Sequence, residues 1–185
     1  MKDPKYVQVI VCGKSGEGVS FVSKILGYAC ALSGKHCTVS PSIEPRVRGG
    51  LVYSDIIVST DEIGCPKVTR ADMLIAFSQS PYELFVKKST KKETAVFYDP
   101  ANVTPDRTAG IKHYAIPCVE KSAKELKTDK ISNIVFLSAI IRLTKIASVD
   151  SLNKAIKANL KEDQLSINLK ALELGTRLAR KIKYP

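Results

Sequence analysis

Tryptophan is absent from this 185-residue chain, and aromatic residues make up only 6% of it. Aliphatic side chains must therefore fill most of the core, for which a hydrophobic content of 44% is ample. No apolar run is long enough to span a bilayer, and the first residues lack the hydrophobic stretch of a signal peptide. These absences argue against a membrane partner and lead us to expect a cytoplasmic protein with a single domain over residues 1–185.

Close cysteine pairs and histidine clusters are also missing. Zinc and iron–sulfur sites normally contain a Cys-x-x-Cys pair, which none of the five cysteines forms: Cys12, Cys30, Cys37, Cys65 and Cys118. Their odd number argues against a disulfide framework. The two histidines, His36 and His113, have no partner at a metal-ligand spacing. The sequence therefore predicts no metal site, no cluster and no catalytic residue on this chain.

Acidic residues are scarce: 18 Asp and Glu face 29 Lys and Arg, which gives a net charge of +11. Such an excess attracts polyanions, and nucleic acid, a phosphorylated cofactor or an acidic protein would each fit. Solubility alone is the alternative, since lysine clusters such as that in residues 87–92 usually form a solvated face. A nucleic-acid site would interleave basic and aromatic residues, whereas the aromatics here lie mostly in apolar runs. We therefore expect no nucleic-acid partner.

The pattern that remains is typical of an α/β protein. Residues 6–12 predict a buried strand, residues 13–18 a glycine-rich loop, and the stretch from Val19 to the stop signal Gly34 an amphipathic helix. A second strand follows over residues 35–40. This order of strand, glycine loop, helix and strand opens a Rossmann-like fold.

Four further strands are expected, over residues 51–59, 71–77, 94–98 and 112–116. Residues 63–68 could pair back as a hairpin, and Pro81 favours a short helix over residues 80–88. The last third is helical, over residues 133–146, 149–160 and 163–182, and the first of these helices is apolar almost all round. We predict a Rossmann-like, mostly parallel sheet with flanking helices and a helical C-terminal segment packed on the same sheet.

The glycine loop has the composition of an anion site but matches no fingerprint. Gly13-Lys14-Ser15 ends like a Walker A motif, yet Gln8 stands where that motif needs a glycine. The glycine spacing also departs from G-x-G-x-x-G, and Ser40 stands where an NAD site needs an acid. The loop amides could approach an anion at the helix N-terminus; equally, the glycines could serve only a tight turn. The candidate cofactor-binding residues here are Gly13, Lys14, Ser15, Gly16 and Gly18.

A second candidate segment follows the second strand. Arg46 and Arg48 lie beside the flexible pair Gly49 and Gly50, and guanidinium groups form planar forks that suit phosphate. The commoner alternative is an exposed loop whose arginines pair with carboxylates. If this segment approaches the glycine loop, the two would build a phosphate pocket between them.

Taken together, these segments resemble the gamma subunit of 2-oxoacid:ferredoxin oxidoreductases. The first loop is similar to the family's G-x-G-G-Q-G, and the family's Pro-x-x-x-Pro-Glu-x-Arg-Gly-Gly matches Pro41, Pro45, Arg48, Gly49 and Gly50. The Ile-Gly-x-Pro segment at 63–66, the strand at 71–76 and the closing helices around Asn133 and residues 168–175 follow in the family's order. Ser15, Glu17, Arg46 and the pair Ile43-Glu44 depart from it.

The resemblance implies a role inside a larger complex. Such a complex oxidatively decarboxylates a 2-oxoacid, forms an acyl-CoA and reduces ferredoxin. Thiamine diphosphate would lie between alpha and beta subunits, and iron–sulfur clusters on beta and delta subunits. This chain would bind no cofactor tightly, would be inactive alone, and would assist assembly and contact coenzyme A. Its Arg48-Gly49-Gly50 and Ile63–Pro66 segments look closer to 2-oxoglutarate-type members than to pyruvate-type members.

Two other classes remain open on the sequence. One is an NADP-binding reductase, with Ser40, Arg46 and Arg48 around a ribose phosphate. The other is a basic RNA-binding protein, whose affinity would fall steeply with salt.

Overall fold

The computed structural model describes residues 5–43, 50–88, 90–106 and 110–185. Its six-stranded sheet has the order β2-β3-β1-β4-β5-β6. The strands are β1 (Tyr6–Lys14), β2 (His36–Ile43), β3 (Leu51–Ser59), β4 (Ala71–Ala76), β5 (Thr90–Tyr98) and β6 (Lys112–Ala115). Six helices accompany them: α1 (Val19–Leu32), α2 (Gln79–Lys88), α3 (Cys118–Leu126), α4 (Ser132–Thr144), α5 (Val149–Asn159) and α6 (Glu162–Ala179).

The predicted α/β class, with a Rossmann-like sheet and a helical C-terminal segment, is confirmed, and the sheet contains one strand of opposite direction. β1, β4, β5 and β6 pair in parallel. β3 lies antiparallel between β1 and β2, so β2 and β1 run in the same direction without touching. The strand–loop–helix–strand unit at the start of the chain is therefore split by an inserted strand, which hydrophobic periodicity alone does not reveal.

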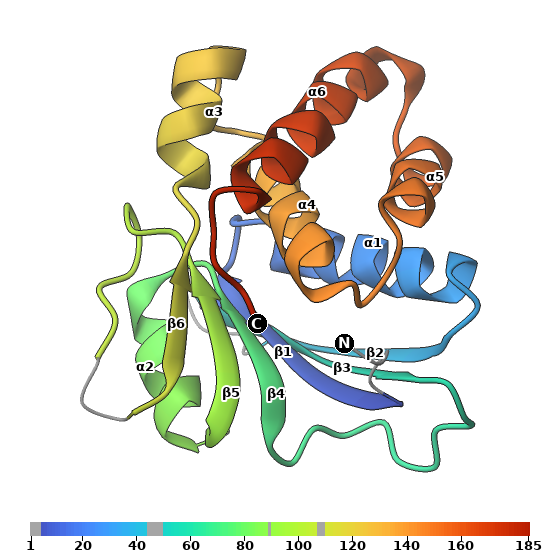
Figure 1. Cartoon of the computed structure of the whole chain (residues 1–185), viewed down its shortest axis with the longest axis vertical. Helices are drawn as coiled ribbons and strands as arrows, with labels where there is room; N and C mark the ends of the chain where they lie inside the picture. The colour runs from blue at the N-terminus through green and yellow to red at the C-terminus, as the bar shows by residue number, and fades with distance from the viewer. Residues whose placement is uncertain (1–4, 44–49, 89, 107–109) are drawn as a thin grey trace.

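One face of the sheet carries most of the core. α1 packs on β2, β3 and β1, and α5 packs on α1; Figure 1 shows α1 and α4–α6 gathered on this side of the sheet. The apolar residues of this face form one cluster that runs from Val9 and Ile56 through Leu26 to Phe136 and Leu174. As predicted from its all-round apolar pattern, α4 is buried at every position from 134 to 141.

The opposite face is covered by α2, which packs on β1, β4 and β5. Tyr82, Phe85 and Val86 of α2 join Ile10 and Leu74 of the strands in a second, smaller cluster. The prediction of a hairpin at residues 63–68 is wrong, because this segment forms no strand. Side chains hold it instead, since Asp55 Oδ2 accepts from the Val68 amide at 3.2 Å and Gln8 Oε1 from the next amide at 2.9 Å.

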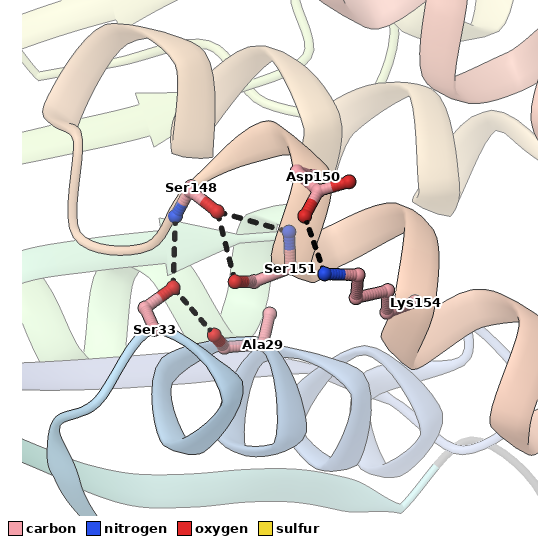
Figure 2. A network of polar contacts seen from close by, with 6 residues as sticks. All are labelled: Ala29, Ser33, Ser148, Asp150, Ser151 and Lys154. Atoms are coloured by element: carbon pink, nitrogen blue, oxygen red, sulfur yellow. Dashed lines mark hydrogen bonds and ion pairs between the residues drawn. The ribbon is translucent and has the colours of Figure 1, made fainter.

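Two contacts fix the helical tail. The α5 N-cap, Ser148, accepts from the Ser151 amide at 2.9 Å, and its own amide donates to Ser33 Oγ at 3.0 Å, which ties α5 to the end of α1 (Figure 2). α4 and α6 approach closely at Gly175, where an added Cβ would strike the Val135 carbonyl oxygen and lie 2.7 Å from Ser138 Cβ. In the described part of the chain, no helix combines the length and apolar character needed to cross a membrane.

Candidate functional site at the glycine loop

The glycine loop lies at the point in the sheet where the direction of winding changes. β1 leads into α1 on one face, and its parallel neighbour β4 leads into α2 on the other. Loops that leave the carboxyl ends of two such strands diverge and leave a crevice between them. Open α/β sheets bind ligands in that crevice. The fold therefore places the predicted loop residues at the edge where a ligand is expected.

Gly13 is buried because three neighbours close over it. A Cβ there would lie 2.6 Å from Glu17 Oε2, 2.7 Å from Val19 Cγ2 and 2.9 Å from Phe77 Cβ. The Glu17 carboxylate folds back across this glycine. Its Oε2 accepts from the Lys14 amide at 2.7 Å and from Ser78 Oγ at 2.8 Å. Glu17 thus joins the loop to the segment that follows β4. It also accepts the hydrogen bond of one loop amide, that of Lys14, which is then not free for a ligand.

The loop then turns through two glycines with positive φ, Gly16 at 97° and Gly18 at 84°. Both lie in the left-handed region that favours glycine. An added Cβ at Gly18 would strike the side-chain nitrogen of Asn133, at the start of α4, whereas Gly16 is open to solvent. Among the described residues, the amides of Gly16 and Gly18 have no hydrogen-bond acceptor.

The expected approach of the glycine loop and the arginine segment is observed at Gly50, the last residue of that segment. The Ser15 amide donates to the Gly50 carbonyl at 2.9 Å, and Lys14 pairs with Leu51 at the end of the β1–β3 ladder. Gly50 therefore lies against the glycine loop. Arg46, Arg48 and Gly49 lie outside the described residues, so their part of the predicted pocket stays a prediction.

A cavity of about 240 Å³ opens beside this loop. Its lining comes from the loop, the residue after β4, the segment after β5 and the start of α4: Gly16, Glu17, Phe77, Asn102, Ser132 and Asn133, together with Asp129 and Lys130. The lining supplies hydrogen-bond donors and acceptors and side chains of both charges. It suits a polar ligand.

The electrostatics of the loop favour binding over catalysis. Burial raises the pKa of the Cys12 thiol, and the nearby Glu17 charge raises it further, so this thiol stays protonated and unreactive. Lys14, Ser15 and Gly16 are exposed and offer a cation, a hydroxyl and a free amide. In the part of the chain that the structure describes, no three His, Cys, Asp or Glu side chains lie close enough to hold a metal ion.

Several residues of this site were not among the predicted site residues, and three of them hold the glycine loop in place: Glu17, Ser78 and Asn133. Glu17 could have been found, because a carboxylate three residues after Lys14 can reach back to that amide across the turn. Ser78 follows a strand whose carboxyl end shares the edge with β1. Asn133 comes from a helix more than 100 residues away, and no local pattern links it to Gly18.

The fold and this loop define a class: an α/β protein with a glycine-loop candidate site where the winding of its sheet changes direction. The model of the pyruvate ferredoxin/flavodoxin oxidoreductase family matches residues 8–178. The chain belongs to this family. It is 32% identical to the 2-oxoglutarate synthase subunit KorC of Methanocaldococcus jannaschii over 178 residues, which cover 95% of each chain.

Two solved structures show the same arrangement. The gamma subunit of a keto/oxoacid ferredoxin oxidoreductase from Geobacter sulfurreducens superposes with a TM-score of 0.85 at 24% identity, and the match covers 97% of this chain and all of that one. The 2-oxoglutarate:ferredoxin oxidoreductase of Magnetococcus marinus, solved with 2-oxoglutarate, coenzyme A and succinyl-CoA bound, gives a TM-score of 0.88 at 28% identity. That match covers 98% of this chain and 32% of the other. The expected assignment to the gamma subunits of 2-oxoacid:ferredoxin oxidoreductases, which work within larger complexes, is confirmed.

Proposed function

We propose that this chain is the gamma subunit of a complex that oxidatively decarboxylates 2-oxoglutarate, forms succinyl-CoA and reduces ferredoxin. One observation carries the choice of substrate: the KorC relative aligns along 95% of both chains and is named for 2-oxoglutarate. The Magnetococcus marinus enzyme, which contains a segment similar to nearly the whole chain, also acts on 2-oxoglutarate. The oxoacid itself would bind on other subunits.

In this proposal, the alpha, beta and delta subunits of the complex carry thiamine diphosphate and the iron–sulfur clusters. These groups supply the carbanion and electron-transfer chemistry. The gamma chain contributes no acid, base or nucleophile. It assembles with the other subunits and presents its glycine-loop edge to coenzyme A.

The contact with coenzyme A rests on the geometry of that edge. Coenzyme A carries a diphosphate and a ribose phosphate, and its amide-containing pantetheine arm suits a polar cavity. Phosphate oxygens would accept from the amides of Gly16 and Gly18 at the N-terminal end of α1. Lys14 adds a cation, and Gly50 fixes the end of the arginine segment beside Ser15. Arg46, Arg48 and Gly49 would then lie within reach of the same phosphates.

Glu17 sets a limit on this site. Its carboxylate occupies the Lys14 amide and brings a negative charge next to the remaining donors. A phosphate must therefore bind toward the exposed side of the loop, at Gly16, rather than over Gly13.

The substrate is tested with the complex purified through a tag on this chain. We expect ferredoxin reduction to depend on coenzyme A and to run faster with 2-oxoglutarate than with pyruvate or 2-ketoisovalerate. Faster turnover with pyruvate would overturn the substrate while leaving the family assignment intact. Purification of this chain without any partner subunit would overturn the proposed assembly.

The coenzyme A contact is tested by Arg48→Ala in the assembled complex. Loss of one charge-assisted hydrogen bond should weaken coenzyme A use by about 1–3 kcal/mol, measured as a rise in its KM. Arg46→Ala is the matched control and should have the smaller effect, because the resemblance places no arginine there. Decarboxylation without coenzyme A should be unchanged in both variants. An intact Arg48→Ala complex with an unchanged KM for coenzyme A would contradict the contact.

A further inference from the structure

Two of the five cysteines are brought together by the fold. Cys12 and Cys118 are buried in separate places, and Cys65 is exposed in the segment after β3. Cys30, in the last turns of α1, and Cys37, at the start of β2, lie on elements that pack against each other. None of the residues of the glycine-loop site is involved, so this pair is independent of the proposed function.

The geometry of the pair follows from α1. Gly27 and Cys30 are three residues apart and therefore share one face of the helix. That face meets β2: a Cβ added at Gly27 would lie 2.6 Å from Val39 Cγ2 and 3.8 Å from Cys37 Sγ. The Cys37 thiol therefore points at the helix, toward the turn that carries Cys30. The Cys30 thiol donates to the Ile146 carbonyl oxygen at 3.8 Å, and the two thiols lie close enough for each to shift the pKa of the other.

The two thiols differ in accessibility and in acidity. Cys30 is fully buried, with 0% exposure, whereas Cys37 is half-buried and lines an apolar groove of about 560 Å³ together with Tyr28, Val39 and Pro41. The neighbouring Cys30 thiol lowers the pKa of Cys37 against the opposing effect of burial. The Cys37 thiol, and then burial, raises the pKa of Cys30. Cys37 is thus the more accessible and the more acidic thiol of the pair, and Cys30 is its buried neighbour.

This is the arrangement of an attacking and a resolving cysteine. We propose that Cys37 and Cys30 form a redox-sensitive dithiol, which a hydroperoxide converts reversibly into a disulfide between β2 and α1.

The chemistry balances in two steps. The Cys37 thiolate attacks an oxygen of the hydroperoxide, so an S–O bond forms, the O–O bond breaks, and the departing alkoxide or hydroxide takes up a proton. Cys37 is now a sulfenic acid. The Cys30 sulfur then attacks the Cys37 sulfur, an S–S bond forms, the S–O bond breaks, and hydroxide leaves with the Cys30 proton as water. Two thiols are oxidised and one hydroperoxide is reduced to an alcohol, or to water, plus water.

The fold favours closure of the bond over further oxidation. Only the turn through Gly34, whose φ is +77°, separates α1 from β2, so the resolving thiol is already in place when the sulfenic acid forms. A sulfenic acid without such a neighbour proceeds to irreversible sulfinic and sulfonic acids. The pair would therefore protect Cys37 and would pull the start of the edge strand β2 against α1.

The test uses the full chain within its purified complex, treated anaerobically with hydrogen peroxide, alkylated and digested with trypsin. Cleavage after Lys24, Lys35 and Arg46 places Cys30 in the peptide 25–35 and Cys37 in the peptide 36–46. We expect these two peptides to appear joined and to separate again after dithiothreitol. Cys65→Ser is the matched control and should leave the joined species unchanged.

Cys30→Ala should abolish the joined species completely and leave Cys37 as sulfinic or sulfonic acid. Since Cys30 is buried, Cys37→Ser provides a second variant: it should also abolish the joined species and leave Cys30 reduced and unmodified. The proposal would be overturned if, in the unsubstituted protein, peroxide converted Cys37 to sulfinic acid while Cys30 remained a free thiol that is alkylated once the protein is unfolded. Exclusive pairing of Cys37 with Cys65 of another chain would do the same.

Discussion

In the helical tail, α4 buries every residue from 134 to 141 and meets α6 so closely that Gly175 has no room for a side chain. At the carboxyl edge of the sheet, the glycine loop leaves Lys14, Ser15 and Gly16 exposed. Both regions depend on glycine, for different reasons. Gly175 permits close packing, whereas Gly16 and Gly18 permit a backbone turn that leaves amides free. The tail is closely packed, and the loop exposes a cation, a hydroxyl and free amides.

The largest loss of stability is expected from a substitution at Gly175. Gly175→Ala would place a Cβ against the Val135 carbonyl oxygen and Ser138, and backbone atoms cannot move aside without shifting a helix. The better helix propensity of alanine offsets part of this cost. We expect a net destabilisation of about 2 kcal/mol, which lowers Tm by roughly 4–8 °C in a chain of this size. The check is thermal unfolding of the purified chain.

Gly64→Ala is the matched control for that substitution. A Cβ at Gly64 would have no heavy atom within 4 Å, so Tm should be nearly unchanged. Equal Tm values for Gly175→Ala and the unsubstituted protein would show that α4 and α6 do not pack as closely as described.

The loop is tested through Glu17. Glu17→Ala removes the acceptor for the Lys14 amide and for Ser78 Oγ, although water can replace part of the first contact. We expect a loss of about 1.5 kcal/mol in the free energy of unfolding, measured with urea. Glu17→Gln keeps an acceptor oxygen and removes the charge, so it should recover most of the stability. It should also lower the KM for coenzyme A in the complex, and a raised KM would contradict the proposed placement of the phosphates.

A smaller effect is expected where the tail joins α1. Ser148→Ala removes the N-cap of α5 but keeps the hydrogen bond from its backbone amide to Ser33 (Figure 2). N-cap substitutions of this kind cost about 1 kcal/mol. The exposed Asp150–Lys154 pair on the same helix provides the control, since Lys154→Ala should cost less than about 0.5 kcal/mol. A similar loss in both variants, measured by urea unfolding, would contradict the role of the cap.

Several elements could be predicted from the sequence because their signals are local. The start of α1 at Val19, its stop at Gly34 and the buried helix α4 follow from spacing and composition, and the structure has them within one or two residues. The approach of Gly50 to the glycine loop was also predictable, since the carboxyl ends of strands with the same direction share an edge. Gly50 shows this contact.

The remaining elements depend on partners that are distant in the sequence. α3 was not predicted, because its first turn is held by Asp99 from the end of β5, which accepts from the Val119 amide and from Cys118 Sγ, each at 2.7 Å. The insertion of β3 between β1 and β2 leaves no trace in the period of any single strand. Asn133 enters the site only because α4 packs beside the loop. Each of these features is decided by tertiary contacts.

The most direct test of the central claim is hydrogen–deuterium exchange of the assembled complex with and without saturating coenzyme A. Bound phosphates should slow exchange in residues 13–18 and 44–50, because the free amides of Gly16 and Gly18 become acceptor-bound and the edge is shielded from water. Residues 162–179 of α6 serve as the internal reference and should exchange at the same rate in both states. Slower exchange confined to the glycine-loop edge is the predicted result. Unchanged exchange at residues 13–18, in a complex shown to be saturated with coenzyme A, would contradict the account.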